Sequence, residues 1–193
     1  MCARLSASTV VAVTAIFALL VQNSIPAQSE GKEAKEALMT TPKIEIPQSV
    51  QAEHQAIHSA LVEATKAPGR VGTAAKALAE VLHPHFVREE QIALPPLGLL
   101  APLAAGTKLS DAQVSEALAM TDSLRRELSK MLDEHKQVRV AVEGLRRAAI
   151  EEQALTYQQL ADQLALHAQA EEEVLYPAAV LVGDLIRAKR QGK

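Results

Sequence analysis

Apolar residues recur every three or four positions over most of the chain beyond residue 47, which is the period of a helix with one buried face. The pattern predicts four helices, over residues 48–67, 71–94, 110–151 and 157–188. The "APG" at 67–69 and the pair Pro95-Pro96 should end the first two. Ser110 and Thr156 are suitable N-caps for the third and fourth.

The third predicted helix has about 40 residues, which is long for a globular protein. We expect it to bend or break between Ala119 and Ser123, so that 110–126 forms an extension and the bundle helix begins near 127. The segment 96–109 is predicted to be a connector, with or without a turn of helix.

Composition supports an all-α fold. Of the 193 residues, 48% are hydrophobic but only 2% are aromatic, and the commonest residues are strong helix formers such as Ala, Leu and Glu. The length is sufficient for one domain with its own core. The formal net charge is −3 and no segment forms a large basic face, so nothing points to nucleic acid as a partner.

The first 27 residues are typical of a secretory signal peptide. Arg4 precedes a short apolar run, Val10 to Val21, and "SIPAQS" with Ala27 provides a plausible cleavage site. This predicts a secreted or periplasmic protein, with an uncleaved membrane anchor as the alternative. Cleavage would remove Cys2, the only cysteine, and with it any thiolate ligand. A polar linker (28–47), the helical domain (48–188) and a solvated basic tail (189–193) are expected to follow.

The helical region contains an internal repeat. "EHQAI" at 53–57 matches "EHKQV" at 134–138, and "HFVREEQIALP" at 85–95 matches "HAQAEEEVLYP" at 167–177. The spacing between the two matched histidines is also preserved: His54 and His85 are 31 residues apart, and His135 and His167 are 32 residues apart. The repeat unit is therefore a pair of helices.

The repeated polar residues fall on the apolar faces of their helices. Positions four apart share a face, so His85 lies beside Glu89 and His167 lies beside Glu171. The single histidines, His54 and His135, also lie in line with Leu, Ile and Val. The same geometry predicts that Val174 is buried, that Tyr176 packs outward, and that Glu172 and Glu173 are surface charges.

Four histidines and two glutamates in an apolar core are unfavourable unless they are paired or coordinate a metal. A single core histidine is usually satisfied by a hydrogen bond. Six such groups at repeat-related positions favour a site for two transition-metal ions, with bridging carboxylates and terminal imidazoles. The mixed nitrogen and oxygen donors suit Fe or Mn and would also accept Zn.

The quoted motifs resemble those of the hemerythrin-like family, the "HHE" cation-binding domains, over residues 48–185. The resemblance implies an up-down-up-down four-helix bundle with a non-haem di-iron centre. Glu89 and Glu171 would occupy its bridging positions, and the full ligand set would be His54, His85, Glu89, His135, His167 and Glu171. Members of the family carry or sense oxygen, handle nitric oxide, repair iron centres or bind iron.

The chain departs from the oxygen carriers of that family at one position. Those proteins have a second histidine four residues after the single histidine of the third helix, where this chain has Arg139. Here the second histidine is His58, four residues after His54 on the first helix. His58 is either a fifth imidazole ligand from the opposite side of the pseudo-twofold axis or, as the simpler interpretation, a residue at the rim.

The sequence therefore predicts a di-iron protein outside the cytoplasm that binds or reacts with a small ligand such as oxygen, nitric oxide or peroxide. Binding rather than catalysis is expected, although oxidoreductase activity is left open. Two alternatives are an iron-binding or iron-donating protein without small-ligand chemistry and a metal-free helical interaction module.

Overall fold

The computed structural model describes residues 43–192, and all regular structure within them is helical. The prediction of an all-α domain is confirmed. The predicted signal peptide, 1–27, and most of the predicted linker lie outside the described residues. The main helices are α2 (Gln48–Thr65), α3 (Gly69–Ile92), α5 (Asp111–Glu151), α6 (Leu155–Ala170) and α7 (Tyr176–Gln191).

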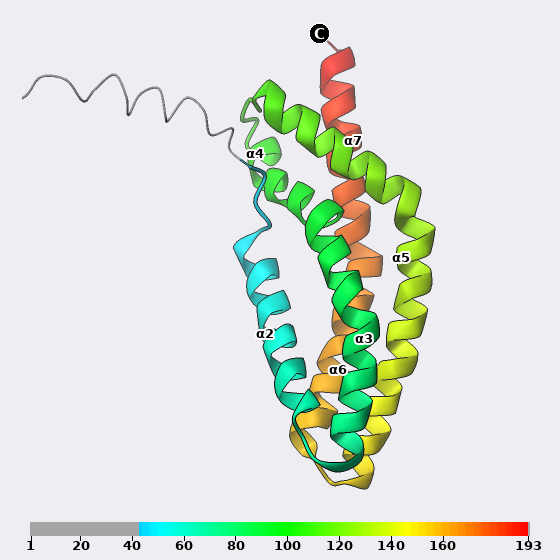
Figure 1. The fold of residues 1–193 in the computed structure, drawn as a ribbon. Helices are drawn as coiled ribbons and strands as arrows, with labels where there is room; N and C mark the ends of the chain where they lie inside the picture. The colour runs from blue at the N-terminus through cyan, green and yellow to red at the C-terminus, as the bar shows by residue number, and fades with distance from the viewer. Residues whose placement is uncertain (1–42, 193) are drawn as a thin grey trace, which may run out of the picture. The chain divides into compact units, whose positions relative to one another are not determined.

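Four helical segments pack around one core. Helix α3 packs against α2 and α5, and α6 packs against α5 and α2, so each helix has two neighbours. Figure 1 shows these segments side by side, with α7 continuing the path of α6. The π-helical turn η2 (Glu171–Leu175) joins α6 to α7. Within the described part of the chain, no helix is both long and apolar enough to cross a membrane.

The connector between α3 and α5 contains the 3-10 helix η1 (Pro95–Leu99) and the short helix α4 (Leu100–Ala104). Beyond it, Ser110 forms the predicted N-cap. Its hydroxyl accepts a hydrogen bond from the Gln113 amide at 3.2 Å, and the Gln113 side chain accepts one from the Ser110 amide at 3.1 Å. This capping box fixes the start of α5.

Of the bend or break expected near 119–123, the break is absent, because helix α5 is continuous over its 41 residues. The helix bends as it passes from its N-terminal part into the bundle (Figure 1). Apolar contacts hold the extension in place, because Ala117 and Leu103 pack with Val182 and Ile186 of α7. Ile44, near the end of the predicted linker, joins the same cluster and is 3% exposed.

The predicted N-cap of the last bundle helix is wrong. Helix α6 begins at Leu155 with Ala154 as its N-cap and no capping side chain. Gln153, between α5 and α6, has a positive φ of 56°, which is a left-handed and not a helical conformation. The Ala154 carbonyl then accepts hydrogen bonds from the amides of Tyr157 and Gln158, so Thr156 is already inside the helix.

Two apolar clusters enclose a polar layer in the bundle. One contains Leu61, Leu78 and Val142, and the other contains Leu94 and Met131. Along each bundle helix the repeated histidines and glutamates lie between the residues of these two clusters. The polar groups are therefore shielded on both sides by Leu, Val and Ala.

The turn η2 changes which residues face the core. Val174, predicted to be buried, is 57% exposed, whereas Tyr176, predicted to pack outward, is 1% exposed. The Tyr176 amide donates to the Glu171 carbonyl, five residues earlier, so this turn contains one residue more than an α-helical turn. The extra residue rotates every later side chain by about 100° relative to a continuous α-helix.

Candidate metal centre

The six residues that the repeat identifies converge in the polar layer. All are buried, with exposed fractions of 3% or less. His54 comes from α2, His135 from α5, and the other four come as two pairs from α3 and from α6 with η2. The predicted core position of all six is confirmed: His54, His85, Glu89, His135, His167 and Glu171.

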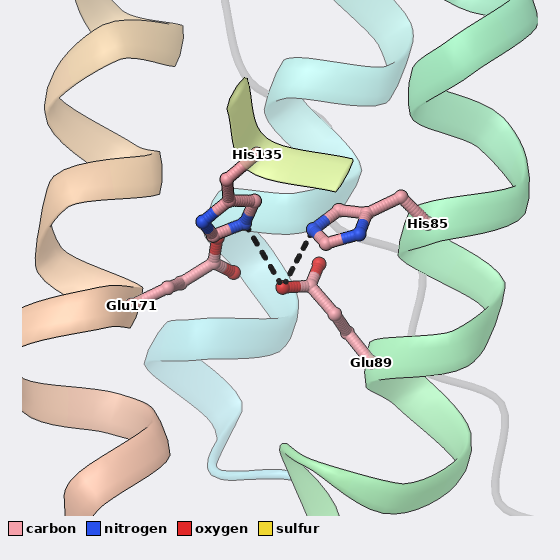
Figure 2. Close-up of side chains that lie close together, drawn as sticks. All are labelled: His85, Glu89, His135 and Glu171. Atoms are coloured by element: carbon pink, nitrogen blue, oxygen red, sulfur yellow. Dashed lines mark ion pairs between the residues drawn. The ribbon is translucent and has the colours of Figure 1, made fainter. Parts of the chain in front are cut away.

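One group of four residues could hold a metal ion. His85, Glu89, His135 and Glu171 each offer one atom, and these atoms lie within 4.8 Å of one another. Glu89 Oε1 lies 3.2 Å from His85 Nε2 and 3.9 Å from His135 Nε2. Figure 2 shows these side chains pointing toward one another from three different helical segments.

A second group lies on the other side of the same carboxylates. His54, His167 and Glu171 also offer atoms within 4.8 Å of one another. Glu171 Oε1 lies 3.3 Å from His54 Nε2 and 3.1 Å from His167 Nε2. The ring of Phe86 stacks on His54 with centroids 4.4 Å apart, so Phe86 borders this group.

Each carboxylate offers one oxygen to each pair of histidines. While Glu171 Oε1 faces His54 and His167, its Oε2 lies 3.4 Å from His135 Nε2. In Glu89 the two oxygens are exchanged: its Oε1 faces His85, and its Oε2 lies 3.9 Å from His54 Nε2. All four imidazoles therefore present Nε2 to the two glutamates.

The outward ring nitrogens have carboxylate partners of their own. Glu134 accepts from His85 Nδ1 at 3.0 Å, and Glu53 accepts from His167 Nδ1 at 3.2 Å. These hydrogen bonds fix the tautomer that leaves Nε2 free to bind a metal. Glu53 and Glu134 are the residues that precede the two single histidines in the repeat, and this repeated "EH" was the signal for their role.

The other two histidines are contacted by the glutamates that follow Glu89 and Glu171. Glu172 accepts from His135 Nδ1 at 2.8 Å and from Arg139 at 2.6 Å, so this partly exposed charge also contacts the buried cluster. Glu172 lies one residue beyond Glu171 on the helix, so it points away from the Nε2 atoms of the cluster and toward the outer edge of the His135 ring. Glu90 lies 3.7 Å from His54 Nδ1. Glu173, in contrast, is exposed and contacts Gln169.

The cluster shifts the protonation of its histidines. Burial alone would lower the pKa of His85, but hydrogen bonds to Glu89 and Glu134 and the charge of Glu171 raise it to about 9. The pKa of His167 is likewise raised to about 9, because Glu171, Glu89 and Glu53 outweigh burial. Without a metal, these two imidazoles are protonated at neutral pH.

The two central carboxylates have different pKa values. Burial and the nearby charge of Glu171 raise the pKa of Glu89. Burial would also raise the pKa of Glu171, but the nearby imidazoles of His135, His167 and His54 hold it well below its usual value. Glu171 is thus the more strongly anionic of the two.

Tyr176 is a member of this site that the periodicity placed elsewhere. Its hydroxyl donates to Glu89 and lies 3.2 Å from His135 Nε2 and 3.5 Å from His85 Nε2. The available signal was Pro177, which lacks an amide hydrogen and whose ring clashes with the carbonyl four residues earlier. A proline there favours a widened turn before it, and the widened turn brings Tyr176 inward.

His58 lies outside both groups. It is exposed, and its ring centroid is 6.4 Å from that of His83, which is also exposed. The two histidines and Phe86 help line a cavity of about 150 Å³ between α2 and α3. This placement favours the rim position that the sequence left open.

The donor set and its unsatisfied atoms fit a metal. Among the described residues, three buried side-chain polar atoms lack a hydrogen-bond partner, and all three belong to this cluster: His54 Nδ1, Glu89 Oε2 and His167 Nε2. Buried polar atoms are normally satisfied, so these atoms suggest a missing bonding partner. Imidazole nitrogens with carboxylate oxygens suit borderline transition metals such as Fe, Mn and Zn.

Comparison with protein-family models found no match, and no curated protein or solved structure gave a significant match.

Proposed function

We propose that this protein is a hemerythrin-like di-iron protein that binds or reacts with a small ligand such as oxygen, nitric oxide or peroxide. The observation that carries the proposal is the placement of Glu89 and Glu171 between two pairs of histidines. Carboxylates with one oxygen toward each pair are suited to bridge two ions. His85 and His135 would be terminal ligands of one ion, and His54 and His167 of the other.

The order of the motifs along the chain supports the same assignment. A single histidine, a His-x-x-x-Glu pair, a second single histidine and a second His-x-x-x-Glu pair come from successive helices. The up-down-up-down arrangement of hemerythrin-like bundles would bring these four segments to one level. The N-terminal signal peptide is part of the proposal and would place the protein outside the cytoplasm.

The iron ions would supply a centre that exchanges electrons and accepts a small ligand. The protein holds the ligand atoms in place through the outer glutamates, because Glu53, Glu134 and Glu172 fix the imidazole rings from behind. Leu, Val and Ala on both sides of the polar layer exclude water from it. Four terminal imidazoles leave more coordination positions open than the five of the oxygen carriers, which favours ligand binding and reaction.

The test is metal content together with an absorption spectrum, recorded on iron-loaded protein with and without oxygen. We expect two iron ions per chain and an oxo-bridged di-iron absorption that changes when azide or oxygen is added. Stoichiometric iron that leaves readily to a chelator, with no spectral response to either ligand, would support iron binding or donation in its place. Failure to take up any metal would overturn the proposal.

A further inference from the structure

Tyr176 is placed among the atoms of one candidate metal group. Its side chain is fully enclosed, and its hydroxyl contacts Glu89 and two Nε2 atoms of the group formed with His85 and His135. Its ring also stacks against His135, with centroids 5.6 Å apart and an angle of 24° between the planes. The hydroxyl oxygen therefore faces the same point as the imidazole nitrogens.

A π-helical turn directs the Tyr176 side chain into the core. The π-helical turn η2 begins at Glu171, and its last hydrogen bond runs from the Tyr176 amide to the Glu171 carbonyl. A continuous α-helix would direct this side chain away from the core, about 180° from His167. Turns of this kind inside helices are frequently found at functional sites. Here Glu171 lies at the start of the turn, and the phenol of Tyr176 follows directly after its end.

The first half of the repeat has a comparable hydrogen bond, spanning five residues at the end of α3, without the phenol. There the Leu94 amide donates to the Glu89 carbonyl at 3.0 Å, also five residues earlier, and Leu94 is fully buried. Leu94 and Tyr176 occupy equivalent positions, each just before a proline. A leucine there supplies no donor atom, so the two halves of the cluster differ by one oxygen atom.

We propose that Tyr176 is a seventh metal ligand, which binds through its phenolate oxygen the ion held by His85 and His135. This inference rests on the proposed metal centre. On binding, the phenol loses its proton to solvent and the oxygen donates a lone pair to the ion. Phenolate is a hard oxygen donor of the kind that ferric iron accepts, as in haem proteins with a tyrosine axial ligand.

Coordination by Tyr176 would make the two metal positions unequal. The His85 and His135 position gains a protein ligand, whereas the His54 and His167 position keeps its open coordination. A small ligand would therefore bind on the His54 side, where Phe86 stacks on the imidazole.

The experiment uses the full chain loaded with iron and oxidised in air. A phenolate bound to ferric iron gives a charge-transfer absorption in the visible, and resonance Raman excitation within this band enhances the tyrosine ring modes. Growth with ring-deuterated tyrosine should shift these modes in the unaltered protein. Tyr176→Phe should abolish the band while the iron content stays at two ions per chain.

Tyr157 provides the matched control, because it is the other tyrosine of the sequence and packs beside the apolar cluster remote from Tyr176. Tyr157→Phe should keep the band and the ring modes unchanged. Iron-loaded protein without tyrosine modes, or a Tyr176→Phe variant that keeps the band, would overturn this ligand assignment and leave the proposed function intact. A chain that binds no iron would overturn both. Should Tyr176→Phe fail to fold, the deuterium shift measured in Tyr157→Phe decides the question, because Tyr176 is then the one tyrosine of the sequence.

Discussion

The carboxylate of Glu134 lies 3.0 Å from the Nδ1 atom of His85, although the two residues belong to different halves of the internal repeat. Glu53 stands in the same relation to His167, at 3.2 Å. Each half of the repeat therefore orients a histidine of the other half. The candidate metal site and the pairing of the two halves depend on the same contacts. A substitution of Glu134 or Glu53 should therefore change the affinity for metal.

Replacing Glu134 with Gln should weaken metal binding by about 10–100-fold, because the His85 ring would lose the charged partner that fixes its tautomer. Competition with a coloured chelator measures this change. Glu63→Gln is the control, since Glu63 is exposed and pairs with Lys66 on the surface of α2. Equal affinities for the two variants would show that Glu134 does not support the site.

The three consecutive glutamates of η2 should respond differently to substitution. Glu171→Gln should remove metal, because Glu171 faces three imidazoles, whereas Glu172→Gln should retain metal with reduced affinity through His135. Glu173→Gln should leave the affinity unchanged. Metal content and chelator competition on the three variants give this order, and equal losses of metal would contradict the assignment of Glu171.

The sequence was sufficient to predict which residues meet in the core. His85 with Glu89, and His167 with Glu171, lie within uninterrupted α-helix up to the glutamate, so their spacing of four residues fixes a shared face. Beyond Glu171 the rule fails, because one widened turn rotates all later residues. Periodicity assumes a constant turn, and it therefore placed Val174 and Tyr176 on the wrong faces.

The outer glutamates were missed for a different reason. Helical periodicity compares residues on one helix, whereas Glu134 and Glu172 act on rings that come from neighbouring helices. Their roles depend on how far the helices are offset along the bundle, which the pattern of one segment does not contain. The repeated "EH" and "EE" pairs carried the information, but only the geometry of the bundle shows which ring each carboxylate reaches.

His58→Ala should leave the metal content and the number of bound imidazoles unchanged. His58 is exposed and lies beside His83, outside both candidate groups. Pulsed electron paramagnetic resonance or X-ray absorption spectroscopy can count the imidazoles on the loaded protein. A count that falls from five to four in the variant would identify His58 as a ligand and contradict its rim position.

Gly183 tests how closely α5 and α7 pack, and Gly144 of α5 serves as the comparison. A methyl group at Gly183 would meet the Thr121 side chain, so Gly183→Ala should lower the free energy of unfolding by about 1–3 kcal/mol. Gly144 has no neighbour within 4 Å of its added methyl group, and Gly144→Ala should raise the free energy of unfolding by about 0.5–1 kcal/mol. Urea denaturation of both variants measures the changes, and stabilisation by Gly183→Ala would show that α7 packs less closely.

Metal binding should release protons and become tighter as pH rises. In the metal-free protein the pKa of His85 and that of His167 are both about 9, so both rings are protonated at neutral pH. A metal needs the Nε2 lone pair, so about two protons must leave these rings when it binds, and a third leaves if Tyr176 binds as phenolate. Calorimetric titration with Zn²⁺, a redox-inert probe, in two buffers of different ionisation enthalpy gives the number released.

The same shifts set the pH dependence of stability without metal. These pKa values lie above the unfolded value of about 6.5, so protonation stabilises the fold fully below that pH, and this contribution is lost as pH rises through about 9. The melting temperature of metal-free protein should therefore fall between neutral pH and about 10, while that of metal-loaded protein falls less. Affinity independent of pH, together with no proton release, would contradict the assignment of His85 and His167 as ligands.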